Sequence, residues 1–214
     1  MMIELKSVSK QEAIHNISIK IKKNELIILH GVSGSGKSTL LHIIASFSKP
    51  SSGSVFISGE DISKYTDYHA ANYRKKTIGY ITQNFYLFET LTVYQNLLPS
   101  TTLTHTSLKT QEQAILKALK MAKIDHKANT TVHHLSGGEK QRLIIARALV
   151  NNPEIILCDE PTANLDAKNS NVFLSIIQEL KALGKTIIIA THDPLFDNLK
   201  DVDKKFILQD GHLE

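Results

Sequence analysis

Two kinds of hydrophobic pattern define strands along this chain. Residues 3–8 and 17–21 alternate apolar and polar side chains with a period of two, which is typical of strands with one exposed face and indicates antiparallel pairing. Residues 26–29, 155–158 and 186–190 are short and almost entirely apolar, which is typical of strands buried on both faces of a parallel sheet. The pattern therefore predicts antiparallel strands attached to a mostly parallel sheet.

Helical periodicity occurs between the buried strands. One helix is expected after Gly36, a second over about 137–150, and a third from Asp166 to Gly184. Apolar residues recur at helical spacing in the first and third of these helices: Leu40, Leu41, Ile43, Ile44, Val172, Phe173, Ile176, Ile177 and Leu180. Strands that alternate with helices indicate an α/β fold whose sheet is covered on both faces.

Residues 84–135 interrupt the α/β pattern. They contain no run of β-branched residues, and apolar positions between Ser107 and Ile124 recur at helical spacing. We interpret the polar tract 100–111 as a solvated loop or the start of a helix. A mostly helical insertion is therefore expected.

The expected organisation is a single domain over residues 1–214. Residues 1–83 and 136–214 would form the α/β core, with the antiparallel strands near its N-terminus, and residues 84–135 would form an inserted helical subdomain. Residues 54–59 and 78–81 read as further strands of the first part.

Composition excludes several classes of protein. The 25 Lys and Arg against 21 Asp and Glu give a net charge of only +4, and no basic stripe is evident, so no nucleic-acid partner is expected. The single cysteine, Cys158, rules out an internal disulfide and fits a reducing compartment. No signal-like apolar region follows Met1, and the apolar runs are shorter than the roughly 18–20 residues of a membrane span. Any membrane role would need a partner.

A glycine-rich loop lies between the strand at 26–30 and the helix after Gly36. Its sequence, G-x-x-x-x-G-K-S, is the phosphate-binding loop in strand–loop–helix context. Backbone N–H groups and the helix N-terminus favour an anion, Lys37 would bind the β- and γ-phosphates, and Ser38 would ligate Mg²⁺. A plain Gly/Ser connector would not place Lys and Ser directly after the last glycine. The expected ATP-binding residues are Gly31, Val32, Ser33, Gly34, Ser35, Gly36, Lys37, Ser38 and Thr39.

Two adjacent carboxylates, Asp159 and Glu160, follow the buried strand at 155–158. Ligands of α/β sheets bind at the carboxyl ends of the strands. Asp159 is expected to hold Mg²⁺, and Glu160 to orient and polarise an attacking water. The alternative is that acidic residues end the strand only for solubility.

The segment Leu135–Arg142 has the sequence LSGGEKQR. Ser136 and Glu139 have the spacing of a helix capping box. That interpretation leaves Gly137 and Gly138 unexplained, since glycine weakens a helix by up to about 1 kcal/mol on interior propensity values. We expect another body to approach the backbone there, and a triphosphate at a helix N-terminus is such a body.

These segments occur together in one order: GVSGSGKST at 31–39, Gln83, LSGGEKQR at 135–142, ILCDEPTANLD at 156–166 and His192. In this combination the chain resembles, over essentially its whole length, the nucleotide-binding subunit of ATP-binding cassette (ABC) transporters. A phosphate-binding loop alone would fit many kinases and GTPases, whereas LSGGE would not.

The resemblance implies roles for several residues. Gln83 would contact Mg²⁺ and water and sense a membrane partner, and Asp166 would lie at a dimer interface. His192, which alone among ten histidines follows a buried core strand, would bind the γ-phosphate and hold the water near Glu160. The residues that would contact ATP held by a second copy are Ser136, Gly137, Gly138 and Glu139. The alternatives are an ordinary polar residue at a strand end for Gln83 and a helix N-cap for Asp166. His133 and His134 are interpreted as solvated turn residues.

The chain departs from the family pattern at two places before the phosphate-binding loop. Asn24 stands where the family usually has glycine, and a left-handed turn tolerates asparagine. The segment between Lys10 and Ile17 is short and lacks the aromatic residue that usually stacks on adenine, so His15 is its only ring. We therefore expect weak recognition of the base.

The expected function is that of an ABC transporter ATPase subunit using ATP and Mg²⁺. Two copies would close around ATP and drive a separate membrane permease from the cytoplasmic face of the membrane. Residues 80–97 and the compact length resemble the lipoprotein-release and macrolide-export branch. The alternative is an ABC-type ATPase that remodels a soluble or membrane-spanning complex without transport. The transported substrate is not encoded in this chain's motifs.

Overall fold

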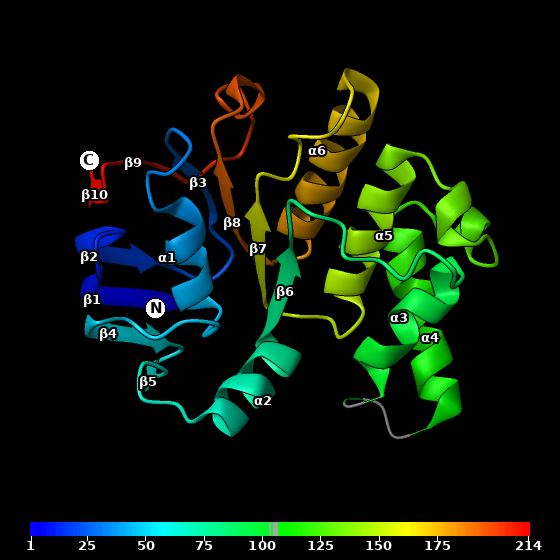
Figure 1. The fold of residues 1–214 in the computed structure, drawn as a ribbon, viewed down its shortest axis with the longest axis horizontal. Coiled ribbons are helices and arrows are strands. Elements are labelled where there is room, and N and C mark those ends of the chain that lie inside the picture. Colours follow the sequence, from blue (N-terminus) through cyan, green and yellow to red (C-terminus); the bar gives the residue numbers. More distant parts are fainter. Residues whose placement is uncertain (103, 105–106) are drawn as a thin grey trace.

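The computed structural model describes residues 1–102, 104 and 107–214 and contains two sheets (Figure 1). Within these residues the smaller sheet has the strand order β2-β1-β4-β5, with antiparallel pairing throughout. Its strands are β1 (Ile3–Lys10), β2 (Ile14–Ile21), β4 (Ser52–Ile57) and β5 (Glu60–Asp61). The antiparallel strands predicted from period-two alternation are confirmed.

The larger sheet contains the predicted buried strands. In the described part of the chain its order is β10-β9-β3-β8-β7-β6, and all pairs are parallel except β10 with β9. Its strands are β3 (Leu26–His30), β6 (Ile78–Ile81), β7 (Ile155–Asp159), β8 (Thr186–Thr191), β9 (Lys204–Gln209) and β10 (His212–Leu213). Cys158 is fully buried on β7, as a small apolar residue would be, and burial raises the pKa of its thiol.

Both faces of the larger sheet are covered. Along β3, Leu26 and Ile28 join one hydrophobic core and Ile27 and Leu29 the other, because successive side chains of a strand point to opposite faces. The first core contains apolar residues of α5 (Gly137–Leu149) and α6 (Ala167–Ala182), and the second those of α1 (Lys37–Ile44) and the antiparallel sheet. This confirms the α/β fold with an antiparallel β subdomain.

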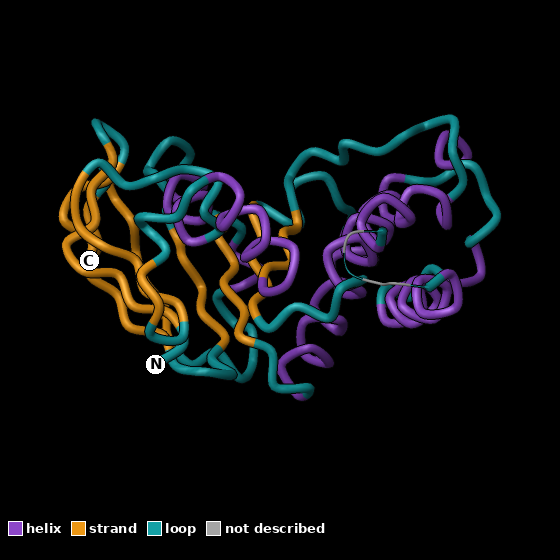
Figure 2. Tube along the Cα trace, turned by 90° about the horizontal axis from the view of Figure 1, so that it is seen from below, coloured by secondary structure: helices purple, strands orange, loops and turns teal. Residues whose placement is uncertain are grey.

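Helices dominate the insertion between β6 and α5. They form a lobe beside the sheets (Figure 2) and comprise α3 (Val93–Thr101), α4 (Leu108–Met121), η1 (Asp125–Lys127) and η2 (Val132–His134). A bridge between Thr92 and Thr131 ties the two ends of this lobe together. The polar tract 100–111 includes the end of α3 and the capped start of α4, and its residues 103, 105 and 106 lie outside the described residues.

Two parts of the fold do not follow from hydrophobic patterning. Helix α2 (Asp67–Thr77) buries only Ala70 and Tyr73, so it has little periodic signal. Strand β9 has a single fully buried residue, Leu208, and its sequence is partly charged because it lies toward the edge of the sheet. A further short helix, η3 (Pro194–Phe196), follows β8.

The helices within the described ranges include none with both the length and the apolar character of a membrane span.

Candidate functional site

The carboxyl ends of four strands gather the predicted site residues at one edge of the larger sheet, uppermost in Figure 1. The phosphate-binding loop follows β3, Gln83 follows β6, Asp159 ends β7 and His192 follows β8. A cavity of about 230 Å³ lies among them. Its described lining residues are Ala13, Ser33, Gly34, Gly36, Lys37, Ser38, Thr39, Gln83, Glu160 and His192. The structure therefore brings residues from five separate segments to one place, the fifth being the turn between β1 and β2 that contains Ala13.

Gly36 allows the chain to turn from the loop into α1. Its φ is 102°, a conformation that residues with a side chain rarely adopt. A Cβ here would also lie 2.4 Å from the carbonyl oxygen of Ala13. The β1–β2 turn thus packs directly against the phosphate-binding loop.

Lys37 points its ammonium group into the centre of this loop. Its Nζ donates hydrogen bonds to the carbonyl oxygens of Gly31 (2.6 Å) and Val32 (3.0 Å) and lies 3.3 Å from Oε1 of Glu160. The side chain is only 5% exposed. A buried ammonium needs compensating oxygen atoms, and here they come from the loop and from the end of β7.

Glu160 contacts His192 as well as Lys37. Its Oε1 lies 2.9 Å from Nδ1 of His192, and its Oε2 accepts a hydrogen bond of 3.3 Å from the backbone N–H of His192. The φ of Glu160 is 45°, so the chain turns sharply at the end of β7. The carboxylate of Glu160 is therefore held between Lys37 and His192, beside the phosphate-binding loop.

Ser38 and Asp159 meet on the other side of the cavity. Oγ of Ser38 donates to Oδ1 of Asp159 at 3.0 Å, and the hydroxyl of Tyr80 lies 3.4 Å from Oδ2. Burial, together with the charge of Asp159, raises the pKa of Tyr80. Within the described residues there is no group of three or more His, Cys, Asp and Glu side chains placed to hold a metal. A hydroxyl beside one carboxylate does suit Mg²⁺, which keeps several waters and is shared with substrate phosphates.

The capping box predicted at the start of α5 is confirmed. Oγ of Ser136 accepts from the N–H of Glu139 (3.3 Å), and Oε2 of Glu139 accepts from the N–H of Ser136 (2.8 Å). The Ser136 N–H and nearby Lys127 lower the pKa of Glu139. None of these residues is among the described lining of the phosphate cavity, and in Figure 1 α5 lies across β6 and β7 from α1. The structure does not bring this segment to the chain's own phosphate-binding loop.

Gly138 also has a reason to be glycine within its own chain. A Cβ on Gly138 would lie 2.1 Å from Oδ1 of Asn169, so a larger residue would require this side chain of α6 to move. At Gly137 the nearest atom to such a Cβ is the carbonyl oxygen of Asn164, at 4.0 Å. A side chain at Gly137 would thus meet nothing closer within its own chain.

Asn169 connects this helix to Asp166. Oδ1 of Asp166 accepts from the backbone N–H (2.7 Å) and Nδ2 (3.0 Å) of Asn169, while Nη1 of Arg142 donates to Oδ1 of Asn169 (2.8 Å). The N-cap role predicted for Asp166 is confirmed. The hydrogen bond from the Asn169 N–H lowers the pKa of Asp166.

Two further histidines lie near the site: His30, which the sequence did not single out, and His15, the only ring in the segment before the phosphate-binding loop. His192 is not alone in following a buried strand, because His30 ends β3, and Nδ1 of His30 is buried without a hydrogen-bond partner in the described part of the chain. His15 lies with its ring 5.0 Å from that of His212 and is not among the described residues lining the phosphate cavity, although Ala13 is. The turn between β1 and β2 spans only residues 11–13.

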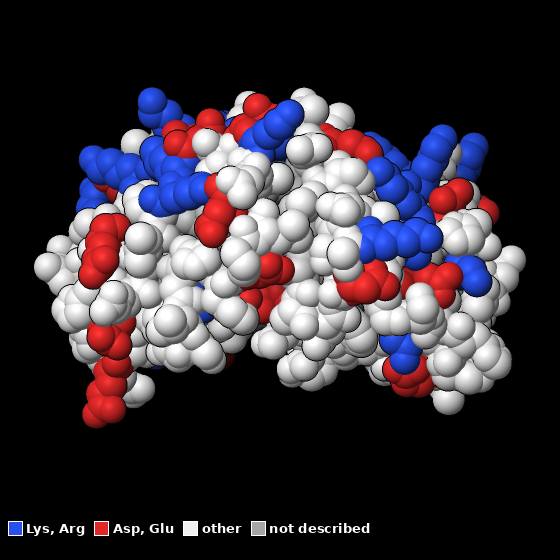
Figure 3. All heavy atoms as spheres, turned by 90° about the horizontal axis from the view of Figure 1, so that it is seen from above, with Lys and Arg blue, Asp and Glu red and all other residues white. Residues whose placement is uncertain are grey.

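Several smaller expectations agree with the structure. Asn24 has a φ of 63°, the left-handed conformation predicted for it. His133 and His134 are exposed in η2. On the face seen from above the edge that carries the site, most Lys and Arg side chains lie in the upper half of the view, with Asp and Glu among them, and much of the lower half is uncharged (Figure 3).

The fold and the site define an α/β ATPase with a phosphate-binding loop and a helical insertion that is followed by LSGGE at the start of α5. The profile of a family described as ABC transporter matches residues 14–163. The chain belongs to the ABC transporter family and is an ATP-binding, ATP-hydrolysing subunit.

Similar proteins support this assignment. The ABC transporter ATP-binding protein MJ1508 of Methanocaldococcus jannaschii is 38% identical over 220 residues, which cover 99% of this chain and 97% of that protein. The macrolide export ATP-binding/permease protein MacB of Campylobacter jejuni is 37% identical over 189 residues, covering 88% of this chain and 30% of MacB. A dimeric post-hydrolysis structure of the ATP-binding cassette MJ0796, bound to ADP and Pi, superposes with a TM-score of 0.89 at 34% identity, covering 100% of this chain and 98% of that one.

Proposed function

We propose that the cavity between the phosphate-binding loop and Glu160 is the hydrolytic site and that the predicted residues act there in named roles. The main support for this proposal is the position of Glu160, which contacts both Lys37 and His192 at the carboxyl end of β7. The triphosphate would lie along residues 31–39, where its oxygens replace the Gly31 and Val32 carbonyls as partners of the Lys37 ammonium.

Mg²⁺ would be held by Ser38, Asp159 and Gln83. When bound, it supplies positive charge that offsets the charge developing on the phosphate oxygens. The pair formed by Ser38 and Asp159 is already assembled at 3.0 Å, and Gln83 lines the same cavity.

Glu160 would accept a hydrogen bond from the attacking water and so align it with the γ-phosphate. His192 would hold the carboxylate through Nδ1 and donate to the γ-phosphate through its other ring nitrogen. Both side chains remain hydrogen-bonded to each other throughout this step, so the carboxylate keeps its direction.

Glu160→Gln tests this assignment. The amide keeps the shape of the side chain but loses the charge that polarises water, so we expect ATP to bind and hydrolysis to fall by roughly 10²–10⁴-fold. Phosphate release and ATP binding would be measured, with Glu154→Gln, an exposed carboxylate at the far end of β7, as the control. Near-normal turnover by Glu160→Gln would contradict the role.

We propose that two copies associate around ATP, with Ser136, Gly137, Gly138 and Glu139 of one chain at the phosphate-binding loop of the other and Asp166 at the interface. Support comes from the distance between this segment and the chain's own loop, and from the open surface at Gly137. The similar cassette MJ0796 is described as a dimer.

We propose further that a membrane permease docks beside Gln83 and holds the subunit peripherally at the cytoplasmic face of the membrane. Three apolar side chains of the loop after Gln83 are exposed: Tyr86 (73%), Phe88 (58%) and Leu91 (36%). Apolar side chains that gather on a surface mark interaction sites. Coupling to a permease of macrolide-export type is supported by the similarity to MacB.

The permease proposal is tested by recovering the tagged chain with its membrane partner from native membranes. Phe88→Asp should reduce the recovered partner several-fold, whereas Leu116→Asp, an equally apolar exposed site on α4, should not. Recovery of a soluble complex in place of a membrane protein would favour the alternative, an ABC-type ATPase that does not transport.

A further inference from the structure

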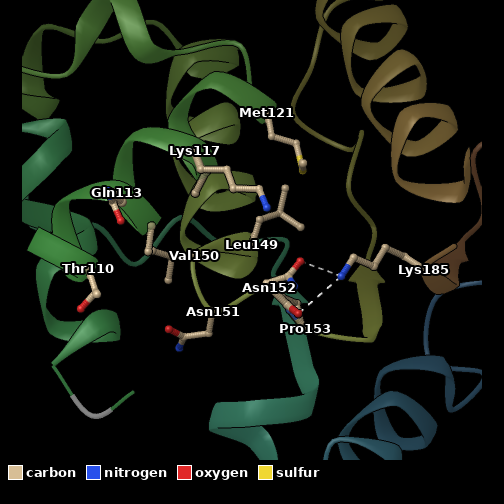
Figure 4. A pocket seen from close by; sticks show the side chains of 12 residues that line it. Thr110, Gln113, Lys117, Met121, Leu149, Val150, Asn151, Asn152, Pro153 and Lys185 are labelled. Atoms are coloured by element: carbon tan, nitrogen blue, oxygen red, sulfur yellow. Dashed lines mark hydrogen bonds between the residues drawn. The ribbon is translucent and has the colours of Figure 1, made fainter. Parts of the chain in front are cut away.

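A recess lies between the helical lobe and the core, outside the ATP site. One wall is α4, and the other is the turn that leads from the end of α5 into β7, joined by Lys185 from the loop before β8 (Figure 4). Its volume is about 350 Å³, within the range of small-molecule pockets. Its described lining residues are Thr110, Gln113, Ala114, Lys117, Ala118, Met121, Leu149, Val150, Asn151, Asn152, Pro153 and Lys185.

The walls of this recess are mainly apolar. Ala118, Leu149 and Val150 are almost completely buried, and Met121 and Pro153 extend the same surface. Burying hydrocarbon on such walls is favourable by about 25 cal/mol for each Å² removed from water. The recess therefore suits a ligand with a short apolar body.

Two cationic side chains reach into it from opposite walls. Lys185 donates from Nζ to Oδ1 of Asn152 (2.9 Å) and to its carbonyl oxygen (3.4 Å), while Lys117 extends from α4 over Leu149 (Figure 4). The described lining residues include no carboxylate. Two positive charges thus share an apolar recess without a counter-charge in its described walls.

This arrangement disfavours the charged form of Lys185. Burial lowers the pKa of its ammonium group, and the positive charge of Lys117 lowers it further, while Glu154 acts in the opposite direction. Glu154 lies outside the lining and is 3.9 Å from Lys23. An anionic group between the two lysines would remove the repulsion and supply hydrogen-bond acceptors.

We propose that this recess binds a small amphiphilic carboxylic acid, with its carboxylate between Lys117 and Lys185 and its hydrocarbon chain against Ala114, Ala118 and Met121. Because the two walls belong to the helical lobe and to the core, the ligand holds these two parts together. The inference does not depend on how the ATP site works, since the two sites share no described lining residue.

Octanoate is a suitable probe, with octanamide as its uncharged counterpart. Calorimetric titration of the whole chain with octanoate should show saturable binding to one site, at least about tenfold tighter than octanamide, because a charge-assisted hydrogen bond is lost in the amide. Octanoate should also raise Tm, since a ligand that binds only the folded state stabilises it.

Three variants locate the site. Lys117→Met should weaken octanoate binding about tenfold or more while keeping an apolar chain of similar length, and Ala114→Phe should abolish it by filling the recess. Lys120→Met is the matched control, because it removes an exposed lysine from the same helix but lies outside the lining. Unchanged ATPase activity would show that each variant is folded. Absence of saturable binding, equal binding of octanoate and octanamide, or unchanged binding in both Lys117→Met and Ala114→Phe would overturn the proposal.

Discussion

At the scale of single residues, Lys37 and Glu160 are in contact, and they are the residues proposed to hold the phosphates and to orient the attacking water. Lys37 bonds two loop carbonyls and lies 3.3 Å from Glu160, so the site places a cation where the phosphates are expected and keeps it buried. Because the ammonium group is already held inside the loop, phosphate binding needs only an exchange of its oxygen partners.

Lys37→Ala should therefore abolish hydrolysis and severely weaken nucleotide binding, because the β- and γ-phosphates lose their fixed counter-charge. A titration with a fluorescent ATP analogue measures the loss. Lys49→Ala, an exposed lysine beyond α1, controls for the change in net charge. Wild-type affinity in Lys37→Ala would contradict the assignment.

The sequence predicts which residues gather around the phosphate cavity, because most of them follow the carboxyl ends of strands that are recognisable as buried. Gly31 to Thr39, Asp159, Glu160 and His192 follow that rule. The close approach of Asn169 to Gly138 could not be predicted, since it depends on how α5 and α6 pack against each other. The buried Nδ1 of His30 was missed for the same reason, because its surroundings come from distant segments.

At the scale of elements, the turn between β1 and β2 is the segment expected, from the family resemblance, to supply an aromatic ring for the base. This turn is three residues long, packs Ala13 against Gly36 and carries no aromatic side chain. The His15 ring is paired with His212 instead of lining the phosphate cavity. Affinity should then rest on the triphosphate.

We expect ATP and GTP to be hydrolysed at rates within about tenfold of each other, a difference below roughly 1.4 kcal/mol. Stacking on an aromatic ring is worth about 1–3 kcal/mol for a base, and this turn does not supply it. Comparing kcat/KM for the two nucleotides tests this, with His15→Ala expected to change KM by less than a few-fold. A strong ATP preference that survives His15→Ala would reveal another contact to the base.

Elements without a hydrophobic repeat limit what the sequence alone can predict. The strongly apolar β7 and β8 were expected within a residue or two, whereas α2 and β9 were not. Helix α2 packs through Tyr73 and makes polar contacts such as the hydrogen bond from Arg74 to the carbonyl oxygen of Ser46. Such contacts join residues far apart in the sequence, so a hydrophobic repeat cannot predict them.

At the scale of the whole molecule, the two segments proposed to enclose ATP lie far apart in one chain. The phosphate-binding loop and the start of α5 lie on opposite sides of β6 and β7 (Figure 1), so in the proposed arrangement each faces a second copy. A dimer related by twofold symmetry makes both contacts at once.

Mixing two inactive variants tests this arrangement. Gly137→Arg blocks the open surface of α5 while keeping the capping bonds of Ser136 and Glu139, and Lys37→Ala disables the loop. A mixed dimer has one site with neither lesion, so an excess of Gly137→Arg protein should restore part of the ATPase activity of Lys37→Ala protein. If mixed dimers form and no activity returns, the contacts between copies are not as proposed or both sites must be intact together.

The contact between Gly138 and Asn169 also constrains how this sequence can diverge. A side chain at position 138 requires the Asn169 side chain to move or to become smaller, and losing that side chain removes the acceptor of Arg142 and one of the two donors to Asp166, whose bond from the backbone N–H of residue 169 stays. A substitution at either position is therefore expected to favour a compensating change at the other. Among descendants of this chain, the two positions should covary although they belong to different helices.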